Sequence, residues 1–298
     1  MTDTAGSTVS AAPEQPLIRA RALSKRYGAK RALDDVNLDI PAGRIVGLIG
    51  PNGAGKTTCL KAILGMTPFQ GELSVLGMHP QKDRNQLMEQ VSFIADVAVL
   101  PRWIRVNQLI ELTAALHPRF STERCEALLA MTDVKPDDKV KSLSKGMIVQ
   151  LHLALIMAID AKLLILDEPT LGLDILYRKQ FYSQLLNDYF DEQRTIIITT
   201  HQVEEIEHIL TDVIFVQHGK VVLNHDIDEL QQIYAEVAVN ADNADKARAL
   251  GPIAERSLLG RHVFLFKDRQ RSELAQLGEI HTPSIVDLFV AVMRGGKS

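Results

Sequence analysis

Cysteine, charge of one sign and long apolar stretches are all scarce in this chain. Only Cys59 and Cys125 occur among its 298 residues, too few for a disulfide framework and consistent with a reducing compartment. The formal net charge is -4, so no basic excess favours a nucleic-acid partner. The longest apolar run, residues 151–166, contains a histidine, an aspartate and a lysine and is shorter than the ~20 residues that span a bilayer. We therefore expect a chain that does not itself cross a membrane.

The two ends differ in character from the middle of the chain. Residues 1–16, MTDTAGSTVSAAPEQP, are small, polar and proline-bearing. They lack the cationic start and apolar core of a signal peptide, so we expect a disordered tail. With 46% apolar and 23% charged residues, the chain as a whole has a globular composition. Beyond residue 229 the pattern changes, which indicates a small accessory α/β extension over residues 230–298.

The apolar patterns predict an α/β fold. Alternation over residues 17–40 predicts antiparallel strands. RIVGLIG (44–50), LLILDEP (163–169) and TIIITTH (195–201) are continuous apolar runs, typical of buried strands in a parallel sheet. From about 101 to 158 the period becomes helical. We expect a parallel-sheet core with an antiparallel β-subdomain and an inserted α-helical subdomain.

The helical region has apolar residues at helical spacing on two faces. One face is formed by Val106, Leu109, Ile110, Leu112 and Leu116. The other is formed by Cys125, Leu128 and Leu129.

GPNGAGKTT, residues 50–58, fits the phosphate-loop pattern G-x-x-x-x-G-K-[ST] between a predicted strand and a predicted helix. Its glycines let backbone amides converge on a polyphosphate, Lys56 can reach the β- and γ-phosphates, and the Thr57 hydroxyl can ligate Mg²⁺. The predicted nucleotide contacts here are Gly50, Pro51, Asn52, Gly53, Ala54, Gly55, Lys56, Thr57 and Thr58. A chance glycine-rich turn is the alternative, which the flanking strand and helix disfavour. The core is thus expected to be of the P-loop NTPase type.

Two further strands end in side chains suited to phosphate chemistry. Asp167 is placed to hold Mg²⁺ through water, and Glu168 to orient or deprotonate an attacking water. On its own the DEPT sequence could equally be a strand-ending turn. His201 follows TIIITT, at the edge where ligands collect in open α/β sheets, and is predicted to contact the γ-phosphate, although a lone histidine is usually structural. Glu168, His201 and Lys56 are the predicted catalytic residues.

SLSKGM, residues 142–147, opens an apolar helix. Ser144 could simply cap that helix. The same turn has free amides and no bulky side chain, which also suits an anion such as phosphate. The turn alone leaves both possibilities open.

Taken in order, the phosphate loop, SLSKGM, LLILDEP, LGLD (171–174) and His201 resemble the nucleotide-binding subunit of an ABC transporter, in particular the ATPases of bacterial ABC-2 type exporters. The resemblance covers about residues 17–229. It implies an ATPase that uses ATP and Mg²⁺ and powers export by a separate polytopic membrane permease. It also implies dimerisation with a second ATPase subunit, and a homodimer is favoured because one chain carries every motif. The expected location is the cytoplasmic face of the inner or plasma membrane, peripheral through the permease, with no nucleic-acid partner.

The resemblance also assigns roles by position. Ser144 and the Gly146 amide would bind the γ-phosphate of the second subunit's ATP. Tyr27 would stack on adenine, and Asp174 would communicate across the dimer. The segment 101–116, with Trp103, would contact the permease, while burial in the subdomain core is an equal alternative for Trp103.

Three positions depart from the family pattern. Lys145 and Met147 stand where glycine and glutamine are usual. Asp96 stands where a glutamine usually helps to hold Mg²⁺. A carboxylate can ligate Mg²⁺, but it adds negative charge beside the triphosphate, so we expect coupling or turnover to differ from the family norm.

Two other functions share parts of this sequence pattern. A soluble ABC protein acting on ribosomes or DNA is the alternative, since fold and motif do not determine the partner. Such relatives usually have two cassettes or a long coiled-coil insertion, whereas this chain has one phosphate loop and little room between Lys56 and Asp167. An unrelated P-loop kinase or GTPase is disfavoured by SLSKGM and by the lack of an N-K-x-D motif. The transported substrate and the role of the C-terminal extension stay open.

Overall fold

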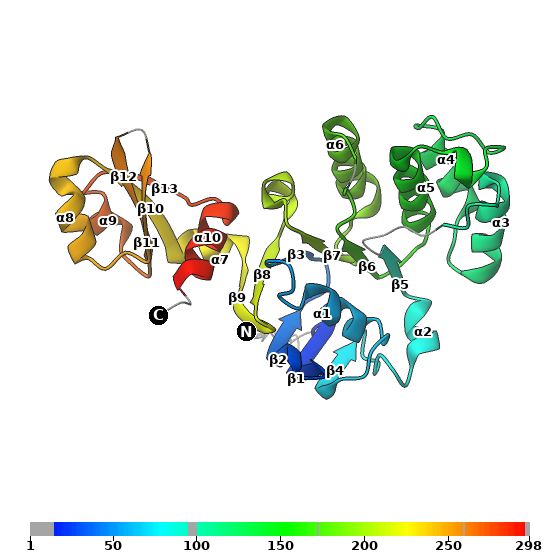
Figure 1. The fold of residues 1–298 in the computed structure, drawn as a ribbon, viewed down its shortest axis with the longest axis horizontal. Coiled ribbons are helices and arrows are strands. Elements are labelled where there is room, and N and C mark those ends of the chain that lie inside the picture. Colours follow the sequence, from blue (N-terminus) through cyan, green and yellow to red (C-terminus); the bar gives the residue numbers. More distant parts are fainter. Residues whose placement is uncertain (1–14, 95–99, 172, 259, 296–298) are drawn as a thin grey trace, which may run out of the picture.

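The computed structural model describes residues 15–94, 100–171, 173–258 and 260–295. Within these residues the strands form three sheets (Figure 1). Most of the predicted disordered tail lies outside the described residues. Asp96 also lies outside them. The architecture confirms the expected α/β class, with a mainly parallel core, an antiparallel sheet, a helical insertion and a C-terminal α/β unit.

The main sheet has the strand order β5-β6-β7-β3-β8-β9. Strands β5 to β8 in this order run parallel, and β9 returns antiparallel after a turn at His218. Every residue of β3, β6 and β7 is buried, as expected for strands covered on both faces. Their bounds are β3 (Ile45–Ile49), β5 (Val91–Ile94), β6 (Leu163–Asp167), β7 (Thr195–Thr200), β8 (Asp212–Gln217) and β9 (Lys220–Asp226).

A smaller antiparallel sheet lies below helix α1 in Figure 1. Its order is β2-β1-β4, with bounds β1 (Ile18–Tyr27), β2 (Lys30–Ile40) and β4 (Gln70–Val75). Alternate residues such as Ile18 and Ala20 are buried and share one core with α1 (Lys56–Ile63) and with Val46 and Leu48 of β3. This packing sets the start of α1 against both sheets.

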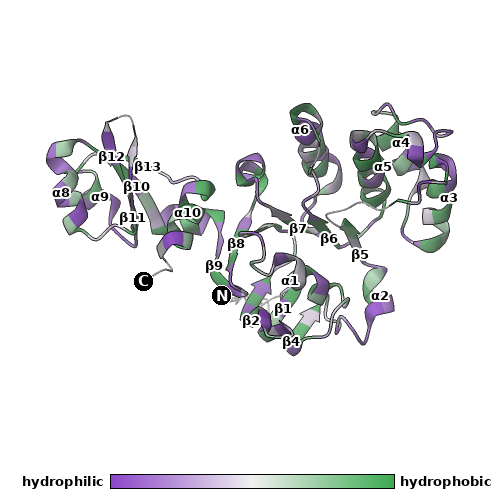
Figure 2. Ribbon diagram, viewed as in Figure 1, coloured by the Kyte–Doolittle hydropathy of each residue, from purple (hydrophilic) through white to green (hydrophobic). Residues whose placement is uncertain are grey.

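The helical insertion lies at one side of the main sheet (Figure 1). Its helices are α3 (Val106–Leu116), α4 (Thr122–Leu129) and α5 (Lys145–Met157); α2 (Arg84–Met88) precedes it, and 3-10 turns occupy Val140–Ser142, Val203–Glu205 and Glu207–Ile209. Helix α5 and the strands beside it stand out as hydrophobic in Figure 2, and from Gln150 onward α5 is buried except for the half-buried His152. Helix α6 (Ile175–Gln184) continues into a π-helical turn, Leu185–Tyr189.

Only part of the apolar face predicted for α3 is buried. Val106, Leu109 and Ile110 are buried, whereas Leu112 and Leu116 are 42% and 75% exposed. The first half of α3 thus contributes to the core of the insertion, and its second half lies largely at the surface. Core burial is wrong for Trp103, which is 76% exposed.

The C-terminal unit is a four-stranded antiparallel sheet with helices on both sides. Its order is β11-β12-β10-β13, with α8 and α9 packed through Val237, Phe264 and Leu274. Bounds are β10 (Tyr234–Val239), β11 (Ala254–Leu258), β12 (Arg261–Lys267), β13 (Glu279–His281), α7 (Ile227–Ile233), α8 (Ala241–Ala249), α9 (Arg271–Leu274) and α10 (Ile285–Gly295).

Helix α10 joins this unit to the main sheet (Figure 1). The ring of Phe289 packs edge-on against Phe215 of β8, with centroids 5.2 Å apart. The side-chain amide of Gln217 donates to the carbonyl of Met293 (3.2 Å). Across the described ranges, no helix is both long and apolar enough to traverse a lipid bilayer.

Candidate functional site

The loop of residues 50–55 connects β3 to α1, and residues 56–58 of the motif form the first turn of that helix, as predicted. Gly55 has φ 118°, and a Cβ there would lie 2.4 Å from the carbonyl oxygen of Ala32, so only glycine fits. A Cβ on Gly50 would come equally close to the carbonyl oxygen of Val216, at 2.3 Å. Helix α1 begins without a side-chain cap. Its first amides are therefore left for an anion.

Lys56 folds back over this loop. Its ammonium donates a hydrogen bond to the carbonyl of Gly50 (2.6 Å) and lies 3.5 Å from that of Pro51. Burial lowers the pKa of Lys56, while the nearby carboxylates of Glu168 and Asp167 act in the opposite direction. The cation thus stands between the loop carbonyls and two carboxylates, where a phosphate would be its natural partner.

Asp167 and Thr57 bring oxygens together beside Lys56. The Thr57 hydroxyl donates to Oδ2 of Asp167 (3.2 Å), and the Thr199 hydroxyl donates to Oδ1. Asp167 is only 3% exposed. Since Mg²⁺ prefers oxygen ligands, a hydroxyl and a buried carboxylate that face one another beside a phosphate loop fit this ion.

Glu168 and His201 meet at the same edge of the sheet. His201 Nδ1 lies 2.9 Å from Glu168 Oε2. Glu168 has φ 50°, a left-handed conformation that costs a non-glycine residue about 1–3 kcal/mol and is found at functional sites. Its amide donates to the carbonyl oxygen of Thr199 (3.1 Å), which anchors the turn.

One cavity unites most of the predicted nucleotide residues. It is lined by Tyr27, Lys30, Ala32, residues 52–58, Asp167 and Glu168. The Tyr27 ring is 49% exposed at its rim, and its hydroxyl lies 3.4 Å from that of Thr67.

Sequence reasoning missed Lys30 and Ala32. Tyr27 pairs with Lys30 across the β1–β2 hairpin. A predicted role for Tyr27 could therefore have pointed to Lys30, which adds a second cation to the cavity.

Ser144, Gly146 and Asp174 lie outside this cavity, and Gly50, Pro51 and His201 are not among its lining residues either. The Ser144 hydroxyl caps α5 by accepting from the amide of Met147 (3.2 Å), and a Cβ on Gly146 would meet only the Ser144 hydroxyl, at 3.9 Å. Asp174 caps α6 by accepting from the amides of Leu176 and Tyr177. Ser144 and Asp174 are exposed. Within one chain Ser144 therefore caps α5, as one of the two interpretations of SLSKGM predicts. The turn does not line the cavity of the phosphate loop.

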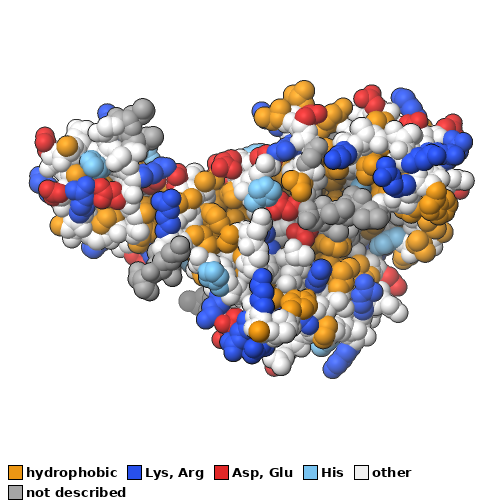
Figure 3. Space-filling view, viewed as in Figure 1, with side chains coloured by type: hydrophobic (Ala, Val, Ile, Leu, Met, Phe, Trp, Pro, Cys, Tyr) orange, Lys and Arg blue, Asp and Glu red, His pale blue; other side chains and the backbone are white. Residues whose placement is uncertain are grey.

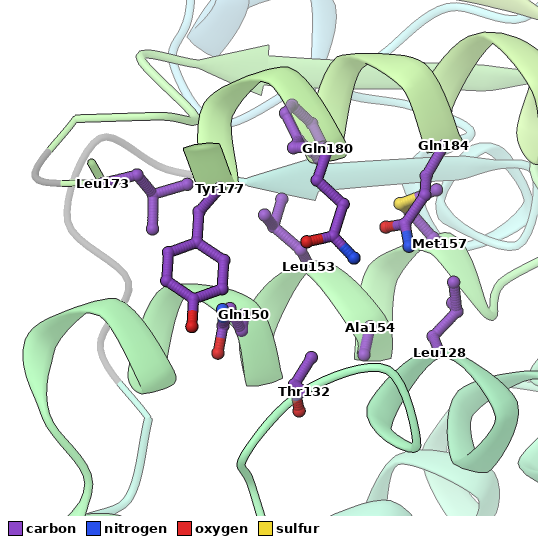
Figure 4. Close-up of a pocket in the computed structure, with 11 residues that line it drawn as sticks. Leu128, Thr132, Gln150, Leu153, Ala154, Met157, Leu173, Tyr177, Gln180 and Gln184 are labelled. Atoms are coloured by element: carbon purple, nitrogen blue, oxygen red, sulfur yellow. The ribbon is translucent and has the colours of Figure 1, made fainter. Parts of the chain in front are cut away.

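The two capped helices pack on one another. Figure 4 shows Tyr177, Gln180 and Gln184 of α6 directed toward α5, around a small cavity. The facing α5 side chains include Gln150, Leu153 and Met157. The caps at Ser144 and Asp174 thus belong to a single packed pair of helices.

Several known proteins are similar to this chain in sequence. A sequence model of the family described as "ABC transporter" matches residues 33–171. The uncharacterized ABC transporter ATP-binding protein YdbJ of Bacillus subtilis is 28% identical over 236 residues, covering 78% of this chain and 77% of that protein. The Nod factor export ATP-binding protein I of Rhizobium johnstonii is 34% identical over 205 residues. That alignment covers 66% of this chain and 65% of the relative, so the chain matches just under two thirds of that protein's length.

Two solved structures have a similar fold. The structure of an ATP binding subunit of an ABC transporter superposes with a TM-score of 0.67 at 25% identity, covering 72% of this chain and 92% of that one. The fold of cbiO1 from Clostridium perfringens, described as part of the ABC transporter complex cbiONQ, matches with a TM-score of 0.62 at 23% identity, covering 73% and 91%. Residues 33–171 thus match the ABC transporter family, and the relatives in sequence and structure are ATP-binding proteins of such transporters, a family of ATPases.

Proposed function

We propose that this chain is the ATP-hydrolysing subunit of an exporter whose membrane-spanning permease is a separate chain. The observation that carries the proposal is the convergence of the phosphate loop, Asp167 and Glu168 on one cavity, with His201 held against Glu168. Residues 17–229 would form the ATPase domain, and residues 230–298 an accessory extension.

ATP would bind with its phosphates in the loop of residues 50–58. The amides at the start of α1 and the Lys56 ammonium would hold the β- and γ-phosphates. Tyr27, exposed at the rim, would stack on adenine. Mg²⁺, held by Thr57 and Asp167 with Asp96 as a further candidate, would neutralise charge on the phosphates.

Hydrolysis would depend on Glu168 as the base for the attacking water. Its carboxylate is placed by the strained turn after β6 and by His201, which contacts it through Nδ1. That contact leaves Nε2 of His201 free to reach the γ-phosphate.

Ser144, Gly146 and Asp174 would act across a homodimer. The amides at the start of α5 are suited to an anion, yet they lie outside this chain's own ATP cavity. A second copy, turned head to tail, would supply its SLSKGM turn (residues 142–147, the signature turn) to this cavity and complete the site. Exposed apolar side chains near Asp174 support an interface here: Leu171, Ile175 and Leu176.

The permease would contact the helical insertion over residues 101–116. Trp103, Leu112 and Leu116 are exposed there, and Figure 3 shows hydrophobic side chains gathered over α3. Contiguous exposed apolar surface marks interaction sites. Docking there would place the ATPase at the cytoplasmic face of the membrane, and export is favoured because several relatives are named as Nod factor export proteins. No nucleic-acid partner is expected.

Complementation between two inactive variants tests the shared site. Lys56→Ala removes the phosphate-loop cation, and Gly146→Asp places a carboxylate in the signature turn. Each variant alone should be inactive, whereas a mixture forms heterodimers with one intact composite site and regains ATPase activity. A mixture that stays as inactive as its components, although both variants still form mixed dimers with wild-type chain, would contradict the head-to-tail arrangement.

A further inference from the structure

Arg178 of α6 links two segments. The proposed function places one of them, the turn before Asp174, at the dimer interface, and the other, which follows His201, at the site of hydrolysis. Its Nε donates to the carbonyl oxygen of Leu173 (2.8 Å), in the turn just before Asp174. Its Nη1 donates to Oε1 of Gln202 (2.7 Å) and forms an ion pair with Glu205. One guanidinium therefore spans from the exposed dimer-facing turn to the segment that directly follows His201.

Helix α6 holds the Glu168–Asp174 connection at further points. The Tyr182 hydroxyl lies 3.2 Å from that of Thr170, in a buried contact. Asp174 caps the first turn of the same helix. Figure 4 shows that side chains of α6 point toward α5. Arg178 thus projects from a helix that is anchored to the connection after Glu168 and to the helix that begins at Ser144.

The segment after His201 is held from its other side as well. The amide of Ile285, at the start of α10, donates to Oε2 of Glu207 (3.2 Å). Nearer to His201, the amide of Gln202 donates to the Thr200 hydroxyl (3.0 Å). Among the hydrogen bonds of the described residues, those of Arg178 to Gln202 and Glu205 tie this segment to α6.

The arginine is suited to this position by its shape. The side chains of Arg178 and Glu205 are only 20% and 27% exposed, so their charges are shielded from much of the solvent. Within the described parts of the chain, Glu205 Oε2 is buried and has no hydrogen-bond partner, which leaves Arg178 as the group that compensates this carboxylate. A rigid guanidinium group can donate hydrogen bonds to a carbonyl, an amide oxygen and a carboxylate at the same time, whereas a lysine ammonium cannot reproduce that geometry.

We propose that Arg178 is a positioning residue for hydrolysis: it fixes the Leu173–Asp174 turn relative to the His201 segment, so that contact with the second subunit sets His201 and Glu168 for reaction. This inference rests on the proposed function. Arg178 does not line the ATP cavity, so its effect should fall on the chemical step and not on nucleotide binding.

Steady-state kinetics of the purified full-length chain test the inference. Arg178→Gln removes the charge and the fork, and Glu205→Gln breaks the ion pair from the opposite side while keeping its size. The matched control is Lys179→Gln, at the exposed neighbouring position. Both test variants should lower kcat on the order of 10- to 100-fold, the scale expected when a catalytic group is misplaced. The KM for ATP should stay close to wild type, and Lys179→Gln should behave as wild type. Because loss of this largely buried ion pair also costs stability, kcat is compared well below the thermal unfolding midpoint of each variant.

A second measurement separates positioning from folding. Arg178→Lys keeps the charge without the fork, so it too should lower kcat while ATP affinity, measured directly by calorimetry, is kept. Wild-type kcat in both Arg178→Gln and Glu205→Gln, or loss of ATP affinity in parallel with kcat, would overturn the inference. A wild-type chain that binds no ATP would instead remove the proposed function itself.

Discussion

Nδ1 of His201 lies 2.9 Å from Oε2 of Glu168, although 33 positions separate the two residues in the chain. Each follows directly after a strand of the main sheet, Glu168 after β6 and His201 after β7. These strands are parallel neighbours, so their carboxyl ends open on the same edge. The contact joins the predicted base to the predicted γ-phosphate ligand and gives a physical basis for the account of hydrolysis.

Replacement of Glu168 by glutamine should abolish turnover and preserve ATP binding. The amide keeps the size of the side chain but cannot accept a proton, and general-base catalysis contributes about 10²- to 10⁴-fold. Phosphate release and ATP binding, measured on the same preparation, check this. Exposed Glu192 provides the control, Glu192→Gln. Undiminished hydrolysis by Glu168→Gln would remove Glu168 from this role.

Replacement of Asp167 by asparagine should raise the Mg²⁺ concentration needed for half-maximal ATPase activity. The carboxylate would hold the ion through water, and loss of such an outer partner typically costs about 10- to 100-fold in metal affinity. A Mg²⁺ titration at fixed ATP measures the shift. Thr199→Val, which removes the hydroxyl that donates to Asp167, should shift it less. An unchanged Mg²⁺ requirement in Asp167→Asn would show that this carboxylate does not serve the metal.

His152 of α5 should make stability fall in acid. Burial lowers its pKa to about 4 from the ordinary 6.5, so below pH 6.5 the unfolded chain takes up a proton that the folded chain does not. The free energy of unfolding therefore does not depend on this group above about pH 6.5. As the pH falls from 6.5 to 4, it decreases by up to about 1.4 kcal/mol per pH unit.

Denaturation by urea at a series of pH values measures that slope. The variant His152→Leu removes the titrating group, so its stability should decline less steeply than that of wild type over the same range. Equal slopes for the two proteins would mean that His152 is not held neutral by burial.

Trp103→Glu should disrupt coupling to the permease without affecting the isolated ATPase. Trp103 is 76% exposed, so a charge there should leave folding intact but be unfavourable in an apolar interface. Co-purification with the membrane subunit and basal ATPase activity should be compared. Ile253→Glu, at an exposed apolar position in the C-terminal unit, is the control and should keep the permease. Retention of the permease by Trp103→Glu would place the docking surface elsewhere.

The clustering of residues at the strand ends could be predicted from sequence, because the carboxyl ends of parallel strands lie at the same edge of a sheet. Asp167, Glu168 and the phosphate loop are found around one cavity for this reason. The left-handed backbone of Glu168 could not be predicted, since it results from anchoring to Thr199 on the neighbouring strand. The same limit applies to α3, whose periodicity marks Leu116 as apolar but does not reveal that the second half of the helix lies largely at the surface.

Contacts between distant segments were also beyond the sequence. Nothing in the spacing links Arg178 to Glu205, which are 27 residues apart and meet only because α6 packs over the segment after β7. Likewise, the α/β pattern predicted for residues 230–298 does not reveal that α10 packs on Phe215 of the main sheet.

Isolation of the complex from its own host tests the central claim most directly. The tagged Glu168→Gln chain, trapped with ATP in gently solubilised membranes, should retain a polytopic membrane protein in stoichiometric amount, identified by mass spectrometry. Recovery of the chain only in the soluble fraction, with ribosomes or DNA, would contradict the exporter account and favour a soluble ABC ATPase instead.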